Sequence, residues 1–248
     1  MNIKRSNIKL TMEYDGTNYC GWQRQINAIG IQQIIEEAIY KLTSEKVKTI
    51  GSSRTDTGVH AKAFVLNFFT ESTIPPERFR EALNSKLPSD IIIVSSNEVS
   101  KEFHARYSST GKRYCYSILN GANKPAIGRN YVGYYKSPLN VELMQEACKV
   151  FIGEHDFSAF RNLGSSVKST IRIISESYIV KEGNIIKYYV SADGFLYNMV
   201  RIIVGTLLQV GSGKIKVEEI ALIIVSKDRK KAGKSVPASG LCLEEVYY

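Results

Sequence analysis

A short loop around Asp56 has the composition of a catalytic loop. It runs from Gly51 to Ala61 and places Arg54 two residues before Asp56, among small and polar side chains. A neighbouring cation favours the ionised form of a carboxyl group, and an ionised aspartate suits nucleophilic or electrostatic catalysis better than general-acid catalysis. The alternative, and the more frequent outcome for an arbitrary Arg-x-Asp sequence, is an ion pair on a solvated loop.

Arg201 is the second residue whose setting points to chemistry. It interrupts residues 195–210, an apolar run that predicts a buried helix. An unpaired buried guanidinium costs several kcal/mol, so we expect an anionic partner: a carboxylate, a substrate phosphate, or both. Asp56 is one candidate for that partner, and a structural ion pair with another acid is the alternative.

Cations and aromatic side chains are interleaved in residues 103–107 and 112–116. Such interleaving suits nucleic acid, because cations contact phosphates and rings stack on unpaired bases. The alternative is a strand whose tyrosines face the core while its cations face water. A further basic run at residues 227–231 extends such a phosphate track or is simply a solvated surface.

Other familiar motifs are absent from the sequence. Residues 211–214 (Gly-Ser-Gly-Lys) lack the upstream glycine of a P-loop, and Ile215 stands where Ser or Thr would coordinate magnesium. The four cysteines form no Cys-x-x-Cys pair, and the three histidines have no ligand spacing. We therefore expect no metal and no disulfide framework. His60, His104 and His155 could each serve as a base, but none has a Ser or Cys placed by a recognisable motif, so we expect no hydrolase triad.

Composition indicates a globular protein with a polyanionic partner. The chain has 248 residues, 44% hydrophobic and 23% charged, with a formal net charge of +9. A basic excess of this size favours binding to nucleic acid or to an anionic membrane surface. Neither a signal peptide nor an apolar run long enough to cross a bilayer is evident, so we expect a cytoplasmic protein that does not insert into membranes.

Hydrophobic periodicity predicts a mixed α+β protein, because strands and helices occur without strict β-α-β alternation. Strands are expected over residues 8–14, 63–69, 90–99, 114–118, 171–180, 185–192 and 241–246. Helices are expected over residues 31–42, 75–87, 141–151, 195–210 and 217–226. A division between two halves is expected near residues 101–110.

Seven segments together resemble the tRNA pseudouridine synthase A (TruA) family. They occur in the family's order and span nearly the whole chain: Tyr14–Gln25, Arg54–Ala61, Phe103–Arg106, Arg113–Tyr116, Gly153–Phe157, Asp193–Gly205 and Gly240–Leu243. The chain departs mildly from the family pattern at Ser52, Ser53 and Thr57, where the family usually has Ala or Gly.

The resemblance implies a fold, a substrate and a reaction. The fold would be two similar halves about a pseudo-twofold, 1–104 with the catalytic loop and 105–248. Their sheets would join into one mostly antiparallel sheet, with helices on one side and a basic cleft between the halves. The enzyme would be a homodimer that binds tRNA and isomerises uridine at tRNA positions 38–40, in the anticodon stem-loop. It would use no cofactor and no metal.

The resemblance also assigns roles to residues. Asp56 would be the nucleophile, Arg54 would open the stem or fill the gap left by the flipped base, and Arg201 would pair with Asp56. Tyr114 would pack on the uracil and transfer a proton, and Leu241 would be an apolar wall of the pocket. Three further substrate contacts are expected, at Gln23, His60 and Arg106. The chemical route stays open among attack on the base, attack on C1′ and elimination to a glycal.

Two rival functions remain. The first is a non-catalytic RNA-binding or RNA-chaperone protein that uses the same basic cleft. The second is a glycosidase or nucleoside hydrolase that uses Asp56, although such chemistry usually needs two carboxylates in defined roles.

Overall fold

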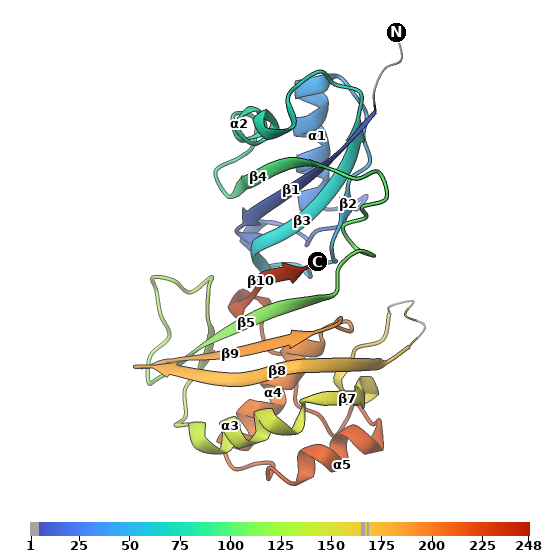
Figure 1. Ribbon diagram of the computed structural model, residues 1–248. Helices are drawn as coiled ribbons and strands as arrows, with labels where there is room; N and C mark the ends of the chain where they lie inside the picture. The colour runs from blue at the N-terminus through green and yellow to red at the C-terminus, as the bar shows by residue number, and fades with distance from the viewer. Residues whose placement is uncertain (1–4, 165–166, 168) are drawn as a thin grey trace. The chain divides into compact units, whose positions relative to one another are not determined.

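The computed structural model describes residues 5–164, 167 and 169–248 and contains two compact units (Figure 1). Unit 1 comprises Met1–Thr110 with Leu243–Tyr248, and unit 2 comprises Gly111–Cys242. The last residues join unit 1 because Glu244 pairs with Lys62 at 3.0 Å and the Tyr248 hydroxyl donates to the Ala105 carbonyl at 2.7 Å. Duplicated halves at 1–104 and 105–248 stay a prediction.

Unit 1 is an antiparallel sheet with two helices. The strand order is β4-β1-β3-β10, and β2 pairs with β3. In the central pair, Leu10 lies opposite Leu66. The strands are β1 (Ser6–Tyr14), β2 (Ile50–Gly51), β3 (His60–Thr70), β4 (Ile91–Val99) and β10 (Leu241–Tyr247), and the helices are α1 (Ile31–Thr43) and α2 (Phe79–Asn84).

The core of unit 1 follows from two periodicities. Alternate residues of β1 point inward, so Ile8, Leu10 and Met12 are at most 1% exposed. On α1, Ile31 and Ile35 are spaced by one helical turn and are fully buried. This helix and the strands that flank it carry the loops on which the candidate site is built.

Unit 2 is a second sheet with three helices. Its strand order is β5-β9-β8-β7, all antiparallel, while the short β6 pairs with β5 in parallel. The strands are β5 (Gly111–Asn120), β6 (Gly133–Tyr135), β7 (Gly153–Asp156), β8 (Ile171–Glu182) and β9 (Ile185–Ala192). The helices are α3 (Val141–Val150), α4 (Met199–Gly211) and α5 (Glu219–Ser226).

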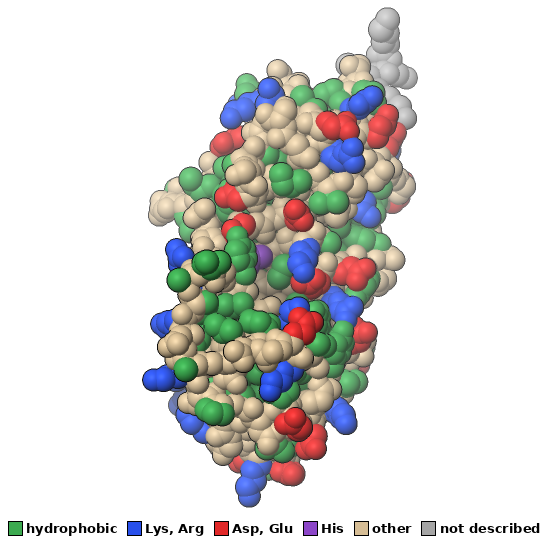
Figure 2. Space-filling view, turned by 90° about the vertical axis from the view of Figure 1, so that its left-hand side faces the viewer, with side chains coloured by type: hydrophobic (Ala, Val, Ile, Leu, Met, Phe, Trp, Pro, Cys, Tyr) green, Lys and Arg blue, Asp and Glu red, His purple; other side chains and the backbone are tan. Residues whose placement is uncertain are grey.

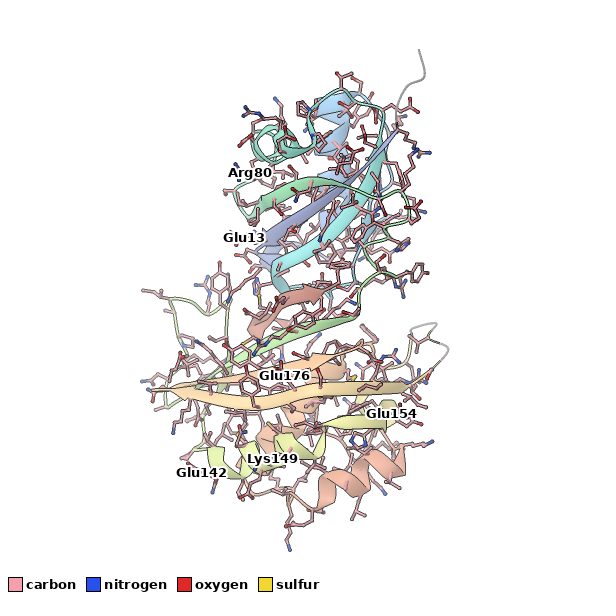
Figure 3. All side chains as sticks on the ribbon, in the orientation of Figure 1. Glu13, Arg80, Glu142, Lys149, Glu154 and Glu176 are labelled. Atoms are coloured by element: carbon pink, nitrogen blue, oxygen red, sulfur yellow. The ribbon has the colours of Figure 1, made fainter. Side chains whose placement is uncertain are left out.

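Helix α3 shows how the sequence sets a helix boundary. Asn140 caps its N-terminus, where the side chain accepts a hydrogen bond from the Leu143 N–H at 3.0 Å. Glu142 lies in the first turn and Lys149 in the last, each of the sign that the helix dipole favours (Figure 3). The opposite face, with Met144 and Cys148, is fully buried.

The predicted mixed α+β class and the mostly antiparallel pairing are confirmed. The prediction of a helix from residue 195 is wrong at its start, because α4 begins at Met199 and Asn198 before it has a left-handed backbone (φ 61°). Strands β2, β6 and β7 were not predicted, since two to four residues are too few to show a period. The joining of the two sheets and a cleft between halves stay predictions.

Candidate active site

The loop that carries Asp56 connects β2 to β3 in unit 1. The Val59 N–H donates to the Asp56 carbonyl at 3.1 Å and closes a tight turn. Gly58 within this turn has φ +78°, a conformation that glycine adopts without steric cost. Asp56 itself is half-buried, so its carboxylate is partly desolvated and still accessible.

Thr55 fixes the backbone immediately before Asp56. Its hydroxyl and that of Tyr14 on β1 are hydrogen-bonded at 2.9 Å in a buried position. Its carbonyl accepts the Trp22 N–H at 3.2 Å, and a Cβ atom on Gly21 would overlap the same carbonyl. Two separate segments therefore hold the loop, which limits the positions that the Asp56 carboxylate can take.

His60 supports the neighbouring loop. It is 6% exposed, and its Nδ1 accepts the Gly16 N–H at 3.0 Å and lies 3.1 Å from Asp15 Oδ1. Both contacts hold the turn that follows β1, against which Val59 of the Asp56 loop packs. The predicted contact of His60 with substrate stays a prediction, since most of its surface is used within unit 1.

Three other predicted site residues of unit 1 are exposed: Arg54, Gln23 and Arg106. Exposure leaves the guanidinium of Arg54 accessible to a phosphate or a base of a bound RNA. The alternative of an Arg54–Asp56 ion pair on a solvated loop stays a prediction.

The other predicted site residues lie in unit 2. Tyr114 is on β5, 6% exposed, and its ring meets that of Phe195 edge-on with centroids 5.1 Å apart. Leu241 begins β10 and is also 6% exposed. Asp56 belongs to unit 1 and Arg201 to unit 2, so the ion pair between them stays a prediction.

Arg201 lies in the first turn of α4, where a cation is electrostatically unfavourable. Two acceptors orient its guanidinium: the Val236 carbonyl accepts from Nε at 2.7 Å, and the Asn198 side chain accepts from Nη1 at 2.7 Å. Neither acceptor neutralises the positive charge. The arrangement is suited to presenting a cation to an anionic group.

The segment that provides the Val236 carbonyl packs directly on α4. A Cβ atom on Gly205 would overlap the Lys234 backbone, and one on Gly233 would overlap the Gly205 backbone. The Gly233 N–H donates to the Thr206 hydroxyl at 2.9 Å. Only glycine at these two positions allows so close a backbone contact.

Tyr116 lies beside this segment. Its hydroxyl donates to the Pro237 carbonyl at 2.9 Å, and its ring lies where Cβ atoms on Gly133 or Gly240 would be. Burial raises the pKa of Tyr116 well above its usual value and outweighs the opposite effect of the Arg201 charge. Tyr116 is therefore a neutral hydrogen-bond donor at physiological pH.

Sequence reasoning missed Asn198, Val236 and Gly233. Asn198 has a recognisable signal, because asparagine is one of the few residue types besides glycine that are enriched in the left-handed conformation. A backbone carbonyl such as that of Val236 has none, since any residue could supply it. The close approach of Gly205 and Gly233 becomes visible only when the two segments are packed together.

Charged side chains of both signs are mixed on the surface. On the face drawn in Figure 2, Lys and Arg side chains are interspersed with Asp and Glu and do not gather into one block. Within the residues that the structure describes, no three His, Cys, Asp or Glu side chains are grouped where they could hold a metal ion. No helix in the described part of the chain has the length and apolarity needed to span a membrane.

Comparison with known proteins adds independent information. A family model described as "tRNA pseudouridine synthase" matches residues 10–108 and 147–248, which include Asp56 and Arg201 but not Tyr114. A Clostridium perfringens protein named tRNA pseudouridine synthase A 2 is 62% identical over 98% of this chain and 99% of its own length. Proteins of Clostridium kluyveri and Clostridium botulinum named tRNA pseudouridine synthase A are each 57% identical with the same coverage.

Proposed function

Because this chain belongs to the tRNA pseudouridine synthase family, we propose that Asp56 is the nucleophile with which it isomerises uridine to pseudouridine in tRNA. The observation that carries the assignment is the setting of Asp56. Its loop is held through Thr55 by two separate segments, and Asp56 itself is half-buried. A fixed and partly desolvated carboxylate is suited to attack on a substrate held in one orientation.

The reaction requires that the target uridine leave the base stack. Flipping costs a few kcal/mol, which contacts with the phosphate backbone offset. The N1–C1′ bond then breaks, the uracil turns, and C5 bonds to C1′, while C5 loses a proton and N1 gains one. No atom is gained or lost, so the reaction needs no co-substrate.

Residues of unit 2 supply the remaining roles. Arg201, oriented by Val236 and Asn198, pairs with the Asp56 carboxylate and keeps it ionised. Tyr114 packs on the flipped uracil and transfers a proton, and Leu241 forms an apolar wall. The low exposure of Tyr114 and Leu241 supports these roles, because a dry pocket strengthens the electrostatic interactions inside it.

We propose that the target uridines are those at positions 38–40 of the anticodon stem-loop. The active enzyme is then a homodimer that binds tRNA in the cytoplasm. The net charge of +9 supports a polyanionic partner. A sedimentation measurement tests the dimer directly, and a monomer at micromolar concentration would contradict it.

The decisive experiment maps pseudouridine on unmodified tRNA transcripts by carbodiimide treatment and reverse transcription. The wild type should produce stops at uridines of the anticodon stem-loop. Asp56→Ala and Asp56→Asn should produce none while binding tRNA within a few-fold of the wild type. Glu37→Gln, at an exposed carboxyl on α1, is the matched control and should retain full activity.

The other outcomes separate the rival functions. Stops that persist in Asp56→Asn remove Asp56 as the nucleophile. Tight tRNA binding without stops in the wild type indicates a non-catalytic RNA-binding protein. Release of free uracil indicates a nucleoside hydrolase.

A further inference from the structure

Among the described residues, Tyr107 is the most exposed aromatic residue. It lies in a turn of unit 1 formed by residues 104–108. Its side chain is 77% exposed, and one face of its ring stacks on the imidazole of His104, with centroids 4.3 Å apart and planes at 28°. The ring contributes nothing to the core of unit 1. No role in the isomerisation has been assigned to either side chain.

Hydrogen bonds hold this turn in one conformation. The Nδ1 atom of His104 accepts the N–H groups of Arg106 and Tyr107, each at 3.2 Å, which fixes the plane of the imidazole. The Ser108 N–H donates to the His104 carbonyl at 2.9 Å, and the Ser108 hydroxyl accepts the His104 N–H at 3.1 Å. The support beneath the Tyr107 ring is therefore preorganised.

Two asparagines attach the turn to the sheet. The Ala105 N–H donates to Asn67 Oδ1 at 2.8 Å, and Asn67 Nδ2 donates to Asn7 Oδ1 at 2.9 Å. Asn7 Nδ2 donates in turn to the carbonyls of Ser100 and Phe103. Asn67 is fully buried and Asn7 is 1% exposed. A well-anchored turn thus presents an aromatic ring to solvent.

We propose that Tyr107, supported by His104, stacks on an unpaired nucleotide of the tRNA substrate. This inference rests on the proposed function for its ligand. Every nucleobase has an aromatic face, and stacking on an exposed aromatic side chain is a common way of holding unpaired nucleotides. The guanidinium of Arg106 lies over the Tyr107 ring, 5.7 Å from its centre, so a base that stacks on the ring moves this cation toward the adjoining phosphate. Because the ring is already held, little conformational entropy is lost on binding.

The first test measures the Kd of Asp56→Asn, used as an inactive background, for an unmodified tRNA transcript. Adding Tyr107→Ala should weaken binding about tenfold, within the range expected for one stacked base. Adding Tyr107→Phe, which keeps the ring, should leave the Kd within about twofold. Tyr40→Ala is the matched control, because Tyr40 is 48% exposed on α1 of the same unit, and it should have no effect.

The second test separates stacking from phosphate contact. Tyr107→Ala should leave the slope of log Kd against log salt unchanged, whereas Arg106→Gln should reduce it by about one. A blunt-ended RNA duplex of similar length has no unpaired nucleotide, so Tyr107→Ala should not weaken its binding.

Three results would overturn the proposal: unchanged affinity in Tyr107→Ala, equal loss in Tyr107→Phe, or dissociation of Tyr107→Ala into monomers. The last result would assign the ring to an interface between copies of the chain. Catalytic activity is measured separately, by pseudouridine mapping with Tyr107→Ala in an enzyme that keeps Asp56. Failure of the stacking site is thereby distinguished from failure of the proposed function.

Discussion

The guanidinium of Arg201 donates from Nε to the backbone carbonyl of Val236 at 2.7 Å, across 35 residues of sequence. The Val236 N–H donates back to the Arg201 carbonyl at 3.3 Å, so the two residues are joined in both directions. The Val236 carbonyl and the Asn198 amide oxygen are both uncharged, so these two acceptors orient the guanidinium without neutralising it. Changes to the residues around this pair should therefore affect catalysis more than substrate binding.

Asn198→Gly removes the second acceptor of Arg201 without straining the backbone, because glycine readily adopts the left-handed conformation at this position. We expect kcat to fall about tenfold, the loss of about 1.4 kcal/mol that one charge-assisted hydrogen bond supplies. The KM for tRNA should change little. Ser44→Gly, at the left-handed residue that ends α1, is the control and should keep full kcat. An unaltered kcat in Asn198→Gly would show that Arg201 does not depend on this contact.

Gly233→Ala should push the segment that carries Val236 away from α4, because the new Cβ atom would overlap the Gly205 backbone. We expect a loss of about 1–3 kcal/mol in the free energy of unfolding, typical of overpacking, together with reduced kcat. Denaturant unfolding and steady-state kinetics measure the two effects. Gly121→Ala has open space around its Cβ and should be neutral in both. Equal stability of the two variants would contradict the close contact.

Tyr14→Phe removes the hydroxyl that is hydrogen-bonded to Thr55 and should loosen the Asp56 loop. We expect kcat to fall several-fold, with about 1 kcal/mol lost from the free energy of unfolding. Tyr19→Phe is a suitable control, because it removes a 2.6 Å hydrogen bond to Asp90 in the same unit but leaves Thr55 untouched. A similar fall of kcat in both variants would indicate general destabilisation instead of positioning of Asp56.

Asp156 should make the stability of unit 2 depend on pH. Burial opposes its ionisation, but hydrogen bonds from Lys227, Ser158 and Thr170 outweigh burial and lower its pKa below the usual range. A carboxyl group with a lowered folded-state pKa stabilises the fold fully above its unfolded pKa of about 3.9. That contribution is lost as the pH falls through the folded-state pKa.

Asp156→Asn should therefore lower the free energy of unfolding by about 1–3 kcal/mol at pH 7, and the difference from the wild type should shrink below about pH 4. Urea unfolding between pH 3 and 8 measures both effects. Glu154→Gln, at an exposed carboxyl on the same strand β7, is the control and should show no such pH dependence (Figure 3). A destabilisation that is constant over the whole pH range would contradict the assignment.

The sequence by itself determined the local features of this protein. Periods of two and 3.6 residues locate the long strands and helices, such as β1 and α1, because alternation and helical stripes are properties of adjacent residues. Residue type and spacing made Asp56 a candidate nucleophile and Arg201 a residue that needs an anionic partner. The resemblance to the tRNA pseudouridine synthase A family then assigned the nucleophile and the pairing of Arg201 with Asp56.

Only the tertiary structure decided which of two tyrosines with similar sequence neighbours is exposed to solvent and which is buried. Tyr107 and Tyr114 both occur among cations in the sequence, yet Tyr107 is 77% exposed and Tyr114 is 6% exposed. The difference follows from hydrogen bonds and packing between segments far apart in the chain, such as the Asn67 contact with Ala105. The Val236 carbonyl orients Arg201 for the same reason. Every residue has the same backbone carbonyl, so the long-range partner of a carbonyl leaves no trace in the sequence.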